Sequence, residues 1–164
     1  MEKDIHTLII RHLSREVRRV PVNWVHPKGE NGKFIPLLDR YNRDIARWDE
    51  GYVQWQAGYF RLYNHPNDNT AVGWATKTEM LVGLSYTEWA GPRPQPENYI
   101  PDWPDKERTH FQMYETVSEG TPVSPVLDAP EALARWLTDN RASLWGNIKA
   151  NYEDWLDIIN SKID

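Results

Sequence analysis

Residues 110–126 read HFQMYETVSEGTPVSPV, and this stretch has the clearest strand pattern in the chain. Successive side chains of a strand point to opposite faces, so Phe111 and Met113 are expected to face the core. The opposite, polar face carries His110, Gln112 and Tyr114. Residues 118–121 have the composition of a turn, and a return segment over 122–127 follows. The stretch therefore predicts a strand, a turn and a return segment, with a polar face that needs an explanation.

Helices are predicted on both sides of this stretch. Asp128 is expected to cap a helix that ends near Asn140 and buries Trp136. Residues 150–159 are expected to form a terminal helix. Apolar side chains recur at spacings of three and four along residues 38–57, which is typical of a helix with one apolar face. A shorter pattern of the same kind predicts a helix over residues 4–13.

The remaining segments are strand-like or irregular. A basic strand is expected over residues 16–22. Residues 20–38 are rich in turn-forming residues, with a tight turn at the Asn-Gly pair. Residues 61–85 show no clear pattern. Residues 87–105 are rich in proline and are predicted to form extended, polyproline-like chain. That segment carries the aromatic residues Trp89, Tyr99 and Trp103.

Together these elements predict an α+β fold, in which three to four helices pack against a small antiparallel sheet. A chain of 164 residues is long enough for one domain with a hydrophobic core. We therefore expect a single domain over residues 1–164. Within it, residues 1–16 form a variable N-terminal helix and residues 17–159 form the core.

The charge distribution narrows the class of partner. The formal net charge is −5, but residues 1–48 hold ten Lys and Arg against six Asp and Glu, whereas residues 97–164 hold six against thirteen. An acidic C-terminal third repels a phosphate backbone, so direct nucleic-acid binding is not expected and a basic protein partner fits better. No apolar run is long enough to span a membrane, and the first residues do not form a signal-peptide pattern.

A basic patch is expected near Trp24, formed by Arg11, Arg15, Arg18 and Arg19, with Lys28 and Lys33 beyond it. Basic residues beside an aromatic ring can bind single-stranded nucleic acid by charge and stacking. Alternatively, these arginines pair with the acidic C-terminal helices of the same chain. The second interpretation is favoured, because it explains the uneven charge without a ligand.

Candidate catalytic and metal-binding residues lack the spacing that such sites need. Ser118, His110 and Asp105 supply the groups of a hydrolytic triad, but no GxSxG motif is present. The candidate metal ligands are His26, His110, Glu115 and Glu119. Neither an HExxH nor a DxDxDG spacing is present, and the chain has no cysteine. We therefore expect a protein that is not an enzyme, with no catalytic residue, no bound metal and no cofactor.

The polar face of the 110–116 strand has two interpretations. Gln112 and Tyr114 can hold the proline-rich segment in place, because prolines lack the N–H that would otherwise bond it. Alternatively, they join His110, and the rings of Tyr99 and Trp103 close over them, to form a cleft for a ligand or a partner.

Three stretches carry a likeness to known sequences. They are VPVNWVHPK (20–28), IPLLDRYNRDIARW (35–48) and EWAGPRPQPENYIPDWPDKERTHFQMYETVSEGTPVSPVLDAPEALARWL (88–137). They resemble a group of small accessory proteins that tailed phages and prophages encode, and the likeness covers residues 17–58 and 86–159. The resemblance implies a phage gene product that acts in the host bacterial cytoplasm. Small phage proteins of this kind are often inhibitors of host defence, anti-CRISPR proteins among them.

The resemblance and the charge together predict a phage-encoded, non-enzymatic binding protein that inhibits or redirects a host protein. The target is expected to be a defence component, such as a basic protein that handles nucleic acids. The contact is expected through the aromatic, proline-rich segment or through an acidic helical face that carries Glu153, Asp154 and Asp157. The alternative is a binder of a small nucleotide-like ligand that uses the strand over 110–116 as its floor. Self-association into a homodimer stays open.

Overall fold

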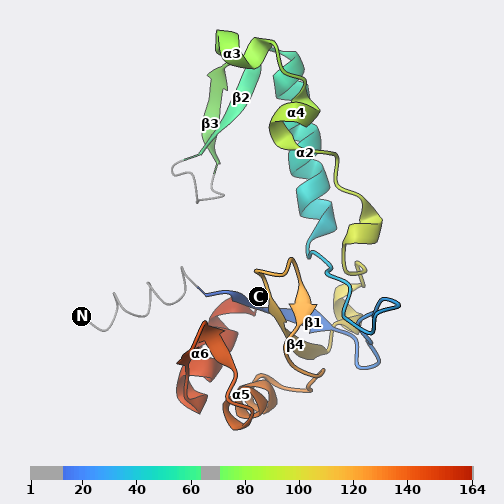
Figure 1. Cartoon of the computed structure of the whole chain (residues 1–164), viewed down its shortest axis with the longest axis vertical. Coiled ribbons are helices and arrows are strands. Elements are labelled where there is room, and N and C mark those ends of the chain that lie inside the picture. The colour runs from blue at the N-terminus through green and yellow to red at the C-terminus, as the bar shows by residue number, and fades with distance from the viewer. Residues whose placement is uncertain (1–12, 64–70, 164) are drawn as a thin grey trace, which may run out of the picture. The chain divides into compact units, whose positions relative to one another are not determined.

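The computed structural model describes residues 13–63 and 71–163 (Figure 1). Its antiparallel strands and helices confirm the predicted α+β class. The sequence suggested one domain, and the chain divides into two compact units. Unit 1 comprises Met1–Leu38 and Pro101–Asp164, and unit 2 comprises Asp39–Ile100. The helix predicted over 4–13 lies outside the described residues, apart from its last residue.

A three-stranded antiparallel sheet, in the order β1-β4-β5, forms the base of unit 1. Its strands are β1 (Arg15–Val20), β4 (His110–Glu115) and β5 (Thr121–Pro122). They confirm the predicted basic strand and the predicted strand, turn and return segment. Val17 pairs with Met113 across β1 and β4, and both side chains contact the same hydrophobic core.

The turn between β4 and β5 depends on Gly120. Its φ of 110° lies in the left-handed region that favours glycine. The backbone N–H of Leu37 donates to the carbonyl oxygen of Gly120 at 3.0 Å, and a Cβ on Gly120 would overlap the carbonyl oxygen of Leu37. Glycine therefore allows the chain before unit 2 to lie directly against the turn.

Two helices pack against this sheet, α5 (Pro130–Asp139) and α6 (Tyr152–Lys162). A short hairpin joins them, formed by β6 (Ser143–Trp145) and β7 (Ile148–Lys149). The centre of the core consists of buried apolar side chains from β4, α5 and α6: Met113, Leu133, Leu137, Trp155 and Ile159. Both helices confirm the sequence prediction to within a few residues.

Two details of these helices differ from the prediction. The residue before α5 is Ala129, which makes no side-chain capping bond, so the predicted cap by Asp128 is wrong. Pro130 still suits the first turn, because a first-turn N–H has no partner inside the helix. By contrast, α6 has a side-chain cap, since the Asn151 side chain accepts a hydrogen bond from the Asp154 N–H at 2.8 Å.

Unit 2 places a long helix beside a hairpin. The helix α2 (Tyr41–Gln56) confirms most of the predicted 38–57 helix. The hairpin β2 (Tyr59–Tyr63) and β3 (Ala71–Thr76) follows, and then the short helices α3 (Glu79–Val82) and α4 (Tyr86–Ala90). The hairpin was not predicted, since residues 61–85 lack a periodic pattern.

The proline-rich segment is less extended than predicted. Helix α4 occupies its start, and two 3₁₀ turns follow, η1 (Pro96–Asn98) in unit 2 and η2 (Asp105–Glu107) in unit 1. The α4 N-terminus has a capping box, in which Ser85 and Glu88 each bond the other's backbone N–H. The prediction of extended chain is therefore wrong at the start of the segment and at the two 3₁₀ turns.

Candidate functional site

The polar face of β4 lies inside the molecule. Tyr114 is fully buried and Gln112 is only 6% exposed. His110 is partly exposed, and its Nδ1 atom lies 2.8 Å from the Thr109 hydroxyl. A strand with one apolar and one polar face therefore has both faces covered at its centre.

A hydrogen-bond network explains how these polar groups are accommodated. The Tyr114 hydroxyl accepts a hydrogen bond from Trp24 Nε1 at 3.0 Å, and it lies 3.0 Å from His26 Nδ1 and 3.1 Å from Gln112 Oε1. Gln112 Nε2 donates to the carbonyl oxygen of Ser124 at 2.8 Å. These bonds fasten the irregular loop after β1 and the segment after β5 onto β4.

The network therefore acts as an internal support, although for a different segment than predicted. The supported loop contains Pro21, Pro27 and Pro36, whose missing N–H groups leave the backbone short of ladder bonds. Of the proline-rich 87–105 segment, Trp103 contributes an edge-to-face ring contact with Trp24, at 4.8 Å between centroids. The prolines of the loop after β1 were the sequence signal that this loop needs side-chain hydrogen bonds.

His26 and Arg18 complete the support. His26 Nε2 lies 2.6 Å from the carbonyl oxygen of Ile35. Burial lowers the pKa of His26, the bond to Ile35 acts in the opposite direction, and the charge of Arg18 lowers it further. The Arg18 guanidinium lies 4.1 Å from the Tyr114 ring centroid and donates to the carbonyl oxygen of Leu37 at 2.7 Å.

An open groove of about 780 Å³ lies over part of this network. The loop after β1, the segment after β5 and helix α5 line it, with Gln112 at its base. Its walls include the aromatic and proline side chains of Trp24, Pro27, Phe34, Pro122, Pro125 and Trp136. Neither His110 nor Tyr114 is among the described lining residues. The predicted cleft over His110, Gln112 and Tyr114 is therefore wrong for two of these residues, because only Gln112 lines the groove.

Tyr99 and Trp103 do not belong to one compact unit. Tyr99 lies in unit 2, where it is buried and its hydroxyl donates to Asp44 Oδ2 at 2.8 Å. Burial, together with the bond to the Asp44 carboxylate, raises the pKa of Tyr99 to about 12. Trp103 lies in unit 1 beside Trp24. Each ring therefore has a packing role within its own unit.

The arginines of β1 form bonds inside unit 1. Arg19 pairs with Asp105 at 2.8 Å and Arg15 lies 3.7 Å from Glu115. The arginines therefore pair inside the chain, but the predicted pairing with the acidic C-terminal helices is wrong, because the acidic partners lie on β1, β4 and η2.

The candidate triad residues have three separate partners. Asp105 pairs with Arg19, His110 contacts Thr109, and the Ser118 hydroxyl contacts that of Thr121. Within residues 13–63 and 71–163, no three His, Asp or Glu side chains are grouped so that they could hold a metal ion. No helix in this part of the chain is long and apolar enough to cross a membrane.

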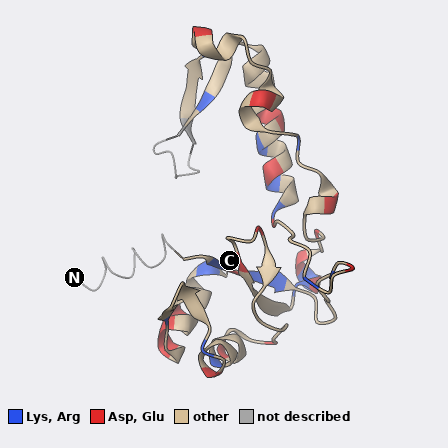
Figure 2. Cartoon of the chain, viewed as in Figure 1, with Lys and Arg blue, Asp and Glu red and all other residues tan. Residues whose placement is uncertain are grey.

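The predicted acidic face is exposed on α6. Glu153, Asp154 and Asp157 all face solvent, and Figure 2 shows acidic residues along this helix. Among the described residues, none of the three carboxylates takes part in an ion pair.

One end of unit 2 exposes a group of apolar side chains that the sequence did not reveal. The pairing of Tyr59 with Thr76 brings the start of β2 beside the end of β3, and α3 follows two residues later (Figure 1). We call this end the apolar tip, and it comprises Val53, Tyr59, Met80, Val82 and Leu84. Met80 is 86% exposed and Val82 is 66% exposed. Large apolar side chains exposed on neighbouring segments make this end a candidate interaction surface.

Comparisons with protein-family models, with curated proteins and with solved structures find no match to this chain. The resemblance to phage accessory proteins therefore stays a prediction.

Proposed function

We propose that this chain is a non-enzymatic binding protein that docks on a partner protein through the apolar tip of unit 2. In the phage setting that the sequence resemblance implies, the partner is a host protein, and docking inhibits or redirects it by covering a working surface. A component of bacterial defence is the target class that this setting favours.

The exposure of the apolar tip carries the proposal. Unit 2 buries three large apolar side chains among its described residues, Trp55, Tyr99 and Ile100. The tip leaves Met80 86% exposed and Val82 66% exposed. Transfer of such a side chain from water to an apolar contact is worth ~1.5–3 kcal/mol. A partner that covers the tip therefore gains binding energy that unit 2 does not use for its own folding.

The alternative function, a small-ligand site on β4, is less well supported. Gln112 and Tyr114 hydrogen-bond each other and their neighbours, so they offer few free groups to a nucleotide-like ligand. The acidic face of α6 adds to the docking proposal in another way. Exposed carboxylates attract a basic partner and raise the rate of association.

Site-specific crosslinking in bacterial cells tests the proposal. A photo-crosslinking residue at position 80 should capture one host protein, whereas the same residue at Asn160, an exposed polar position on α6, should not. The double variant Met80→Asp, Val82→Asp should lose the same partner from affinity capture while keeping its melting temperature. Equal capture from positions 80 and 160, or capture that survives the double variant, would contradict docking through the tip.

A further inference from the structure

We propose that unit 2 also carries a binding site for a planar ring that bears an acidic group. The site is a cavity of about 280 Å³ between α2, β2 and α4. Its described lining residues do not include the apolar tip, so the proposal is independent of the docking surface. The cavity would bind a small molecule and not a macromolecular partner.

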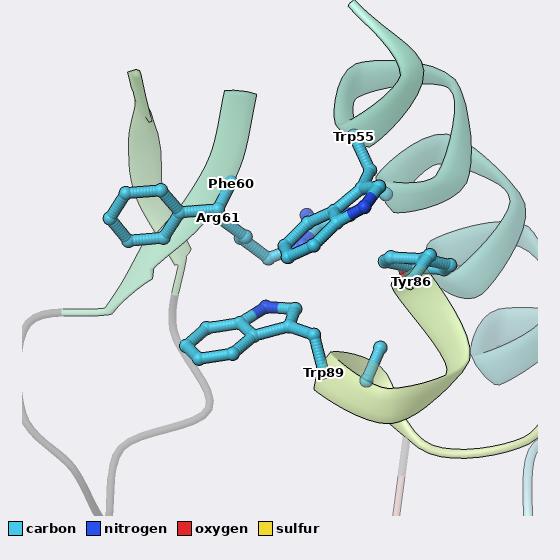
Figure 3. Close-up of a pocket in the computed structure, with 7 residues that line it drawn as sticks. Trp55, Phe60, Arg61, Tyr86 and Trp89 are labelled. Atoms are coloured by element: carbon cyan, nitrogen blue, oxygen red, sulfur yellow. The ribbon is translucent and has the colours of Figure 1, made fainter. Parts of the chain in front are cut away.

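Aromatic rings form the walls of the cavity. Figure 3 shows the indoles of Trp55 and Trp89 facing one another, with Phe60 beside them and Tyr86 on the α4 side. The Trp55 and Trp89 centroids lie 5.9 Å apart with an angle of 22° between the rings, and Phe60 meets Trp89 edge-on at 6.0 Å. Aromatic walls of this kind favour a flat, unsaturated guest.

The spacing of the two indoles limits how a guest can enter. A ring inserted between them would need ~3.5 Å on each side, which is more room than a 5.9 Å separation leaves. The guest therefore lies beside the pair, against Phe60 and the part of Trp89 that is open to solvent. Trp89 is 44% exposed, which gives the guest a route from solvent.

Arg61 supplies the charge that selects the ligand. Its side chain extends from β2 into the cavity (Figure 3) and is mostly buried. Its Nη2 atom donates to the carbonyl oxygen of Arg47 at 3.0 Å and lies 3.3 Å from the Glu50 carboxylate. Within the described residues, its Nε and Nη1 atoms form no hydrogen bond, so the guanidinium keeps donors for a guest.

The same guanidinium excludes the ligand that aromatic cages most often bind. Such cages usually hold a quaternary ammonium by cation–π attraction. Here the cation inside the cavity is the protein's own, and Lys77 Nζ lies 4.3 Å from the Trp55 ring centroid. The exposed Glu50 carboxylate offsets only part of this positive charge, so a second cation is disfavoured. A carboxylate or phosphate beside a ring would pair with Arg61 while the ring contacts the walls.

The test uses ligands that share a ring and differ in charge. Benzoate, benzyl alcohol and benzylamine form one series, and uridine 5′-monophosphate with uridine forms a second. Saturation-transfer NMR and calorimetric titration of the whole chain should rank the acid above the neutral ring and the neutral ring above the amine. Stronger binding of uridine 5′-monophosphate than of benzoate assigns the site to nucleotides, and the reverse order assigns it to aromatic acids.

Two variants connect the affinity to the cavity. Arg61→Gln should weaken binding of the acids by about tenfold, because a charge-assisted bond is lost, and should leave the neutral rings unchanged. Arg93→Gln is its control, since Arg93 is an exposed arginine of unit 2 that pairs with Asp49 outside the cavity. Trp89→Ala should weaken the binding of every ring. Phe34→Ala, which removes a ring of similar exposure from unit 1, should weaken the binding of none.

The result that would overturn the proposal is equally specific. Arg61 selects no ligand if the acid, the neutral ring and the amine bind with equal affinity. The same conclusion follows if neither acid shows saturable binding, or if an acid preference survives Arg61→Gln. Circular dichroism of each variant checks the fold. If Arg61→Gln unfolds, Trp89→Ala remains decisive, because the partly exposed Trp89 ring contributes less to stability than a buried ring.

Discussion

His26 Nδ1 lies 3.0 Å from the Tyr114 hydroxyl oxygen, and this oxygen also lies 3.1 Å from Gln112 Oε1. The hydroxyl has one proton, so it can serve only one of these two neighbours. His26 Nε2 must donate to the carbonyl oxygen of Ile35, which leaves Nδ1 without a proton when the ring is neutral. A neutral His26 and Gln112 therefore compete for the Tyr114 proton, and a charged His26 would end the competition.

The first prediction concerns pH. Burial, with help from Arg18, lowers the pKa of His26 in the folded state below its ordinary value of 6.5. The unfolded chain then binds a proton more readily than the folded chain, so the free energy of unfolding falls as pH drops below 6.5 through the folded pKa. Urea unfolding at a series of pH values measures this loss. His26→Gln should reduce the slope, whereas His110→Gln should keep it; equal slopes in both variants would contradict the assignment to His26.

The second prediction concerns the Tyr114 hydroxyl. Tyr114→Phe leaves Trp24 Nε1 and Gln112 Oε1 without this partner inside the protein, which costs ~1–3 kcal/mol of unfolding free energy. Tyr152→Phe is the control, because the Tyr152 ring packs beneath Arg135 and its hydroxyl forms no hydrogen bond among the described residues. Chemical denaturation of both variants compares them, and equal stability would argue that the network contributes little.

The third prediction concerns the turn after β4. Gly120→Ala combines a strained positive φ with a clash against the Leu37 carbonyl, so we expect a loss of ~2 kcal/mol or more. Gly83→Ala is matched to it, because Gly83 has a negative φ and no atom near the added methyl group. The control should change the melting temperature little. A Gly120→Ala variant as stable as the parent would show that the turn tolerates another conformation.

The fourth prediction separates two tryptophans of the C-terminal helices. The sequence placed Trp136 in the core, but Trp136 is only partly buried and lines the groove, whereas Trp155 is 0% exposed. Trp155→Ala should therefore cost ~3–5 kcal/mol, and Trp136→Ala clearly less. Thermal melts of the two variants rank them, and the opposite ranking would mean that α5 packs differently.

The fifth prediction concerns the acidic face of α6. Replacing Glu153, Asp154 and Asp157 by lysine should slow association with the captured partner, and the effect should fade as salt increases. Glu153 and Asp154 lie in the first turn of α6, where negative charge is favourable, so a small loss of stability is expected as well. Binding kinetics at two salt concentrations, beside a melting curve, separate the two effects. An unchanged association rate would rule out steering by this face.

Local patterns were sufficient for the long elements of this protein. The alternation around Met113 and the apolar spacing along α2, α5 and α6 depend on residues that are neighbours in the chain. The capping box at Ser85 and Glu88, which marks the start of α4, is also a local pattern, but α4 was not predicted from it. The hairpin β2–β3 was not predicted, because its strands YFRLY and AVGWAT lack the alternation of apolar and polar residues that marks β4.

Whether the polar face of β4 is buried or exposed could be seen only in the folded chain. Alternation shows that Gln112 and Tyr114 share a face, but it does not show whether water or protein covers that face. The partner Trp24 lies 90 residues away from Tyr114 in the sequence, and it reaches the hydroxyl only because β1 pairs with β4. The apolar tip has the same origin, since pairing of Tyr59 with Thr76 brings its segments together. Burial and exposure depend on contacts between distant segments, and those contacts exist only after the chain has folded.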